Sequence, residues 1–188
     1  SGDDFTAPVI QAGGAKFDTN GFAITLGLGL TGPGALTKSG TGTLTLGQAN
    51  SYQGGTTVNG GTLSVTGTLG SSDLAVANGA VAELNNPSGA VADTAAVRLT
   101  GTGRIHLAAG VTETVAQLHI DGVLRMPGTW NAARDPLHFS GPGNLIVTTG
   151  GTIAKTFNES DGSLRNDRPV IEGLIAALRL PDIAARFL

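Results

Sequence analysis

The chain has 188 residues, enough for one or two ordinary domains, and 40% of them are hydrophobic, enough for a sizeable core. Only 13% are charged and the net charge is −3, which excludes the basic surface of a nucleic-acid-binding protein. The absence of cysteine excludes disulfide bonds and thiolate metal sites, and no stretch approaches the roughly 18 apolar residues of a transmembrane helix.

A pattern of two short alternating segments joined at a glycine dominates residues 1–150. It recurs in residues 17–26, 36–46, 56–65, 74–84, 97–107, 118–126 and 137–147. The hinge glycines are Gly21, Gly40, Gly60, Gly79, Gly101, Gly122 and Gly141, at spacings of 19, 20, 19, 22, 21 and 19 residues. A fixed period of this kind predicts a repeat architecture, in which each unit buries its apolar face against its neighbours.

The two arms of each unit have the period of β-strands. Val97 and Leu99 precede Gly101, and Ile105 and Leu107 follow it, so every second residue is apolar. This alternation predicts strands with one buried and one exposed face. The side chains that we expect to point inward and stack between units are Leu44, Leu46, Leu63, Val65, Ile105, Leu107, Leu145 and Val147.

Two all-β architectures can use this pattern. Asn20-Gly21, Asn59-Gly60 and Asn78-Gly79 are good type I′ hairpin signals, which indicate an antiparallel meander or sandwich. The alternative is a parallel β-helix in which each unit forms one coil and the glycine turns a corner. The nearly constant period, the aromatic content of 4% and the equal apolar character of the arms favour a solenoid of about seven coils.

The pattern ends near residue 150. Residues 151–167 are predicted to form a polar linker, and residues 168–188 a C-terminal helical segment that begins at Pro169 and is interrupted at Pro181. An apolar stripe at helical spacing comprises Val170, Ile171, Leu174, Ile175 and Leu178. We expect this stripe to cover the open end of the solenoid or to dock on another chain or domain.

Few residues suggest chemistry. Residues 27–32 satisfy G-x-G-x-x-G, but Pro33-Gly34 and a strand follow instead of the helix that a dinucleotide site needs. His106 and His119 are predicted on the exposed faces of adjacent coils, where they could be neighbours, yet two imidazoles alone make a poor zinc site. Asp135, His138 and Ser140 are close in sequence but lack a nucleophile elbow.

Acidic and aromatic residues give no site either, so the sequence predicts no catalytic, cofactor-binding or metal-binding residue. The calcium-binding nonapeptide repeat is absent, and we expect Tyr52 and Trp130 to serve packing rather than sugar binding. The acidic residues show no recurrence at the coil period: Asp18, Asp73, Glu83, Asp93, Glu113, Asp121 and Asp135.

Residues 34–65 (GALTKSGTGTLTLGQANSYQGGTTVNGGTLSV) resemble the autotransporter-associated β-strand repeat, also called the passenger-associated transport repeat, of bacterial surface proteins. Residues 15–26 resemble a segment that often precedes such a repeat, and residues 121–147 resemble its closing unit. The resemblance implies a right-handed parallel β-helix, located outside the cell or on its surface, with no catalytic residues in the repeat.

The expected function is therefore a non-catalytic β-helical stalk or passenger module of a secreted or surface-displayed bacterial protein. Two alternatives stay open: a carbohydrate-active or carbohydrate-binding β-helix, and a subunit that assembles into filaments. Expected partners are other domains of the same polypeptide, or further copies bound through the coil ends or the C-terminal helix. No nucleic acid, membrane span or cofactor is expected.

Overall fold

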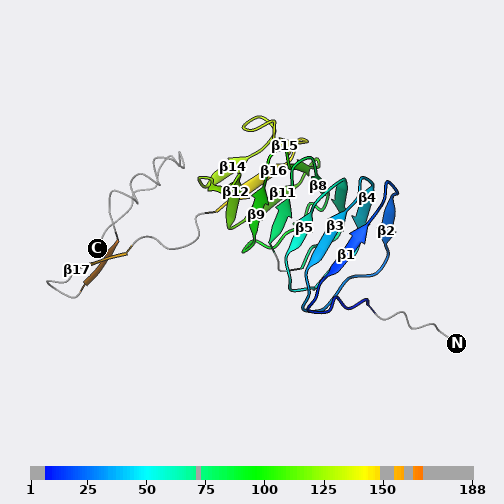
Figure 1. The fold of residues 1–188 in the computed structure, drawn as a ribbon. Coiled ribbons are helices and arrows are strands. Elements are labelled where there is room, and N and C mark those ends of the chain that lie inside the picture. The colour runs from blue at the N-terminus through cyan, green and yellow to red at the C-terminus, as the bar shows by residue number, and fades with distance from the viewer. Residues whose placement is uncertain (1–6, 71–72, 149–154, 159–162, 167–188) are drawn as a thin grey trace. The chain divides into compact units, whose positions relative to one another are not determined.

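The computed structural model describes residues 7–70, 73–148, 155–158 and 163–166. The chain divides into two compact units, residues 1–149 and residues 150–188, which are described separately. The first unit is an all-β parallel solenoid of about five turns, with no helix among its described residues (Figure 1).

Two sheets run along the solenoid, and the chain contributes a strand to each in alternation. The first sheet has the order β1 (Ala15–Asp18), β3 (Leu36–Ser39), β5 (Thr56–Val58), β7 (Leu74–Val76), β9 (Ala96–Leu99), β12 (Gln117–Ile120) and β13 (Val123–Leu124). The second has the order β2 (Ile24–Leu26), β4 (Thr43–Leu46), β6 (Thr62–Val65), β8 (Val81–Leu84), β10 (Arg104–Leu107) and β15 (Phe139–Ser140). Every pair in both sheets is parallel except β12 with β13. The prediction of a parallel β-helix rather than a meander is confirmed.

A third side of the solenoid joins each strand of the second sheet to the next strand of the first. In the early turns it consists of short extended segments held by isolated bridges, Val9 with Thr31 and Ala49 with Thr68. Toward the C-terminal end, a regular sheet forms from β11 (Thr112–Val115), β16 (Asn144–Val147) and β14 (Gly128–Trp130). Each turn therefore encloses its core from three sides.

The register between turns places equivalent side chains on top of one another. Leu44 pairs with Leu63 and Leu46 with Val65, and all four side chains are buried. All eight side chains that the sequence predicts to be inward are buried, and they belong to one continuous core. The predicted inward parity is confirmed.

Six of the seven hinge glycines have the positive φ expected of a corner. In the third unit, the glycine with positive φ lies one residue later than the predicted hinge. There, Gly61 has φ +60 while Gly60 does not lie in the left-handed region. A Cβ on Gly61 would also collide with the carbonyl oxygen of Gly42 in the preceding turn. A glycine is thus required at this position both for its conformation and for the close approach of two turns.

The last two predicted units do not form coils of the same kind, so the expectation of seven equivalent coils needs correction. Ile120 and Val123 pair antiparallel across Asp121 and Gly122, which both have positive φ. Two residues of positive φ directly between two strands form a hairpin turn, whereas the earlier units bend from one sheet into the other. Consequently Leu124 and Met126 are exposed rather than inward.

The seventh unit uses the same alternation in a different pair of sheets. Phe139 in β15 continues the second sheet, and β16 then enters the third sheet rather than the second. Leu145 and Val147 are buried as expected, Phe139 is buried as well, and Leu137 is exposed. The predicted side chains therefore face the core, although the seventh unit does not form a coil like the earlier ones.

Within the second unit, β17 (Lys155–Asn158) and β18 (Ser163–Asn166) pair antiparallel. Both strands fall in residues 151–167, for which the sequence predicts a polar linker. The helical segment predicted for residues 168–188 lies outside the described residues.

Substitution of Leu63 by Asp tests the stacked core. Leu63 is fully buried between Leu44 and Ala82 of the adjacent turns, so an aspartate there has no partner for its charge. We expect Leu63→Asp to lower the free energy of unfolding by about 3–5 kcal/mol, measured by urea denaturation with far-UV circular dichroism. Thr45→Asp, at an outward position of β4, is the matched control and should change it by less than about 1 kcal/mol. Equal effects of the two substitutions would contradict the assigned parity.

Candidate functional site

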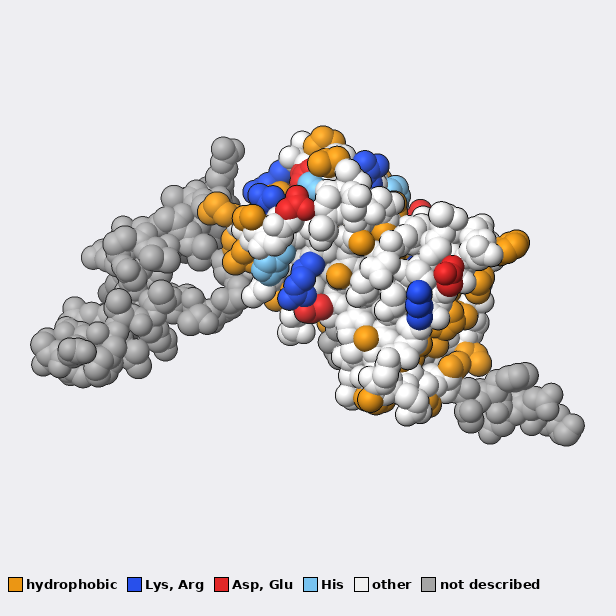
Figure 2. Space-filling view, viewed as in Figure 1, with side chains coloured by type: hydrophobic (Ala, Val, Ile, Leu, Met, Phe, Trp, Pro, Cys, Tyr) orange, Lys and Arg blue, Asp and Glu red, His pale blue; other side chains and the backbone are white. Residues whose placement is uncertain are grey.

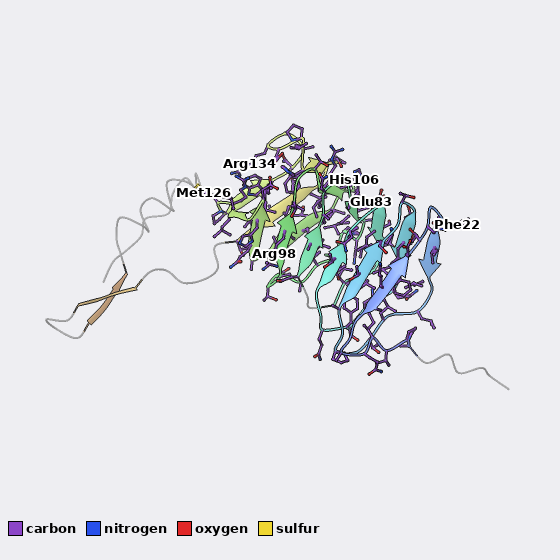
Figure 3. The ribbon with its side chains drawn as sticks, in the orientation of Figure 1. Phe22, Glu83, Arg98, His106, Met126 and Arg134 are labelled. Carbon is purple, nitrogen blue, oxygen red and sulfur yellow. The ribbon has the colours of Figure 1, made fainter. Side chains whose placement is uncertain are left out.

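The two exposed-parity histidines lie on different sheets, so the expectation that they are neighbours is wrong. His106 in β10 lies beside Glu83 of β8, and its Nδ1 is 3.1 Å from the Ser140 hydroxyl oxygen (Figure 3). His119 in β12 lies beside Arg98 of β9. The error follows from the corner: the arm before the hinge glycine belongs to one sheet, and the arm after it belongs to the other.

Asp135, His138 and Ser140 are not arranged as a catalytic triad. His138 Nδ1 lies 2.8 Å from Asp135 Oδ2, but its Nε2 is 3.0 Å from the carbonyl oxygen of Gly101, and the ring is buried. Both ring nitrogens are therefore engaged, and neither faces the hydroxyl of Ser140, which contacts His106 instead. Asp135 Oδ1 also accepts hydrogen bonds from the backbone N–H groups of Leu137 and His138. The group fastens a loop to the solenoid.

The aromatic candidates for sugar stacking, Tyr52 and Trp130, are both buried, as expected of side chains that serve packing. The Tyr52 hydroxyl lies 2.6 Å from the hydroxyl of Thr56, and burial raises the pKa of Tyr52 to about 12. The Trp130 Nε1–H donates to the carbonyl oxygen of Met126, and the Arg134 guanidinium lies 3.9 Å from the centre of the Trp130 ring. Neither ring offers a free face to a sugar.

Lys38 is a buried charged residue that the sequence pattern does not predict. It occupies an inward position of β3, and its Nζ donates to the carbonyl oxygens of Ser39, Gly40 and Gly60 at 2.9–3.0 Å. Burial lowers the pKa of Lys38, and the nearby Asp18 carboxylate opposes this shift. The ammonium uses all three of its donors to join the corner of its own turn to the corner of the next.

Glu113 is a second buried charged residue whose partners are backbone groups. Its side chain is buried, and its two oxygens accept the backbone N–H groups of Ala90 at 2.7 Å and Val91 at 3.0 Å. Burial raises the pKa of Glu113 although both N–H groups act to lower it, and the nearby Asp93 acts in the same direction as burial. The carboxylate satisfies N–H groups on the third side, where β11 pairs with β16 rather than with the preceding turn.

Asn50 plays a similar part inside the repeat. Its side-chain oxygen accepts the Leu30 N–H at 2.8 Å, and its amide nitrogen donates to the carbonyl oxygens of Gln48 and Thr68. Asn50 thereby links the backbones of three consecutive turns on the side that has no regular sheet.

Two further acidic side chains contact residues of a neighbouring turn. Asp73 pairs with Arg98 at 2.6 Å, and Asp121 accepts the Gly101 N–H. Among the described residues, no group of three or more His, Cys, Asp or Glu side chains is placed to hold a metal ion. No helix in this part of the chain is long and apolar enough to cross a membrane. The buried polar and charged side chains of the solenoid thus form hydrogen bonds with backbone groups at the corners and along the third side.

Residues 36–65 match the family described as Passenger-associated-transport-repeat. The chain is also similar to the adhesin BmaC autotransporter of Brucella suis biovar 1 (strain 1330), with 37% identity over 102 residues. This match covers 51% of the chain but only 3% of that protein. No solved structure matches the chain. The chain is a β-solenoid protein that carries a passenger-associated repeat, as its sequence predicts.

The buried Glu113 predicts a specific pH dependence of stability. Because its pKa is raised in the folded state from 4.5, the unfolded chain loses the proton first as the pH rises. The free energy of unfolding should therefore fall between pH 4.5 and the higher folded-state value, and stay low above it. We expect Glu113→Gln to lose this decline in urea denaturation series between about pH 4 and pH 8. Glu83→Gln, on the outward face of β8, is the control and should retain it. An unchanged profile in Glu113→Gln would contradict the assignment.

Proposed function

Given the passenger-associated repeat, we propose that this chain is a β-helical stalk, a non-catalytic passenger module of a secreted or surface-displayed bacterial protein. The match over residues 36–65 and the similarity to an adhesin autotransporter support this proposal. A right-handed sense of the coil is part of the proposal.

The observation that carries the proposal is the unbroken stack of turns. From β1 to β12 and from β2 to β10, each strand is paired in parallel with the equivalent strand of the next turn. The hydrogen bonds between turns run along the stack, and the apolar column inside it is continuous. In such a stack each turn is held by its neighbours, which suits a stalk.

The polar residues support the same conclusion. Lys38, Glu113, Asn50 and His138 are buried, and each satisfies backbone groups of its own or a neighbouring turn. The hydrogen bonds of these side chains are used within the fold, which is the arrangement expected of a structural element and not of a reaction centre.

Removal of one whole turn tests the modular character of the stalk. Deletion of residues 37–56 joins Leu36 to Thr57, which pairs with Thr37 in the register of the sheet. We expect the shortened chain to fold, with a cooperative thermal melt and an unchanged far-UV circular dichroism signal per residue. Deletion of residues 37–57 is the matched control. It puts Val58 at an outward position of the joined strand and leaves the inward position without its apolar side chain, so the cooperative melt should be lost.

Two results would contradict the proposal. Similar folding of both deletions would show that the register between turns does not determine the structure. Release of reducing sugars from polysaccharides by the intact chain, lost in the folded deletion, would favour the carbohydrate-active alternative. Antibody labelling of intact cells that carry the natural gene tests the surface location.

A further inference from the structure

Three corners of the solenoid contain an asparagine followed by a glycine: Asn20-Gly21, Asn59-Gly60 and Asn78-Gly79. All three asparagines are exposed. In such a pair, the backbone nitrogen of the glycine can attack the side-chain amide of the asparagine, because a glycine has no Cβ to hinder the approach. The attack closes a five-membered ring, and it is fast only where the backbone lets the two groups meet. The three dipeptides are identical, but their corners differ in conformation and in hydrogen bonding.

The corner at Asn20 is a closed turn. Asn20 and Gly21 have φ of +42 and +87, and the Phe22 N–H donates to the Thr19 carbonyl oxygen at 2.8 Å. Two central residues of positive φ with this hydrogen bond form a type I′ turn. The left-handed region sets ψ of Asn20 at about +30 to +60°. This ψ directs the Gly21 nitrogen away from the Asn20 side chain, so the ring cannot close unless the turn opens.

The corner at Asn78 is held by the neighbouring turn. Asn78 Oδ1 accepts hydrogen bonds from the Thr102 N–H at 2.9 Å and from the Thr102 hydroxyl at 3.0 Å. The Gly79 N–H donates to the same hydroxyl at 3.1 Å. The turn itself is closed by the Ala80 N–H, which donates to the Ala77 carbonyl oxygen at 3.0 Å. Both reacting groups are therefore engaged, and these hydrogen bonds must break before the ring can form.

The corner at Asn59 has neither restraint. Asn59 does not have a positive φ, and the left-handed residue of this corner is Gly61. Within the described part of the protein, no hydrogen bond holds the Asn59 side chain or the Gly60 N–H, and none closes the turn. The Asn59 N–H donates to the Lys38 carbonyl oxygen, and Lys38 Nζ donates to the Gly60 carbonyl oxygen. Neither of these contacts involves the two groups that react.

We propose that Asn59 is a site of self-modification, at which the side-chain amide is converted to a carboxylate without an enzyme. The Gly60 nitrogen loses its proton to the solvent and forms a bond to Asn59 Cγ. The bond from Cγ to Nδ2 then breaks, and ammonia leaves with a proton from the solvent. Water opens the resulting succinimide ring at one of its two carbonyl carbons. Opening at Cγ gives aspartate, and opening at the main-chain carbonyl carbon gives isoaspartate.

The modification changes both the charge and the geometry of the corner. One neutral amide becomes a carboxylate, so the net charge goes from −3 to −4. Uncharged side chains and backbone cover most of the visible face of the solenoid in Figure 2. Isoaspartate also lengthens the main chain by one carbon, close to Gly61, where even an added Cβ would collide with the Gly42 carbonyl oxygen. The proposal does not depend on whether the chain serves as a stalk.

Peptide mapping by mass spectrometry, after storage of the chain in warm, mildly alkaline buffer, tests the site. Cleavage after Lys38 by trypsin and before Asp73 by an aspartate-specific protease gives each of the three asparagines its own peptide. Fragmentation then locates the conversion, which raises the mass by about 1 Da. We expect Asn59 to convert at least about tenfold faster than Asn20 and Asn78 in the folded chain. In urea, where the corners are lost, the three rates should be similar.

Two variants test the cause of the difference. Gly60→Ala hinders the attacking nitrogen and should slow conversion at Asn59 at least about tenfold. The backbone accepts this alanine, because Gly60 does not lie in the left-handed region and a Cβ there meets the Gly40 carbonyl oxygen at 3.4 Å. Thr102→Ala frees Asn78 and should speed conversion there but not at Asn59. Circular dichroism melts check that both variants are folded.

The comparison of the three sites within the folded parent chain is decisive without any variant. Conversion at Asn59 that is no faster than at Asn20 or Asn78 would overturn the proposal. Conversion at the parental rate in folded Gly60→Ala would also overturn it, because the Gly60 nitrogen would then not be the attacking group.

Discussion

The parallel register between successive turns is the constraint on which the structure depends. Side chains of a strand alternate between its faces, so a register of 19 residues between β4 and β6 sets Leu44 on Leu63 and Leu46 on Val65. A slip of one residue would move the whole apolar set to the outside. The core, the closely approaching glycines at the corners and the outward polar face all follow from this one relationship.

A solenoid must also satisfy the backbone groups that its sheets leave over at corners, along the irregular side and at the ends. Buried polar side chains meet this need one place at a time: Lys38 at two successive corners, Asn50 on the irregular side and Glu113 where the third sheet begins. His138 fastens the last loop to the corner at Gly101. Their burial and their hydrogen bonds explain why polar residues interrupt an otherwise apolar interior.

The sequence predicts the parallel solenoid and the inward parity, because both depend on short-range alternation and a fixed period. It predicts the passenger-associated repeat through the resemblance of residues 34–65 to that family. It does not predict the hairpin at Asp121-Gly122. The signal for this hairpin is the length of the link: two residues separate the strands here, whereas three residues separate β3 from β4 at Gly40. Lys38 and Glu113 are missed because a charged residue at an inward position looks like a break in the alternation. Their partners are backbone groups, which carry no signal in the sequence.

The pairing of turns can be tested directly by nuclear Overhauser effects between backbone protons. The account predicts contacts that join residues 43–46 to residues 62–65, one turn further along the chain, and residues 36–38 to residues 56–58 in the other sheet. Contacts that instead join residues 36–39 to residues 43–46 across Gly40 would show an antiparallel hairpin and would contradict the solenoid.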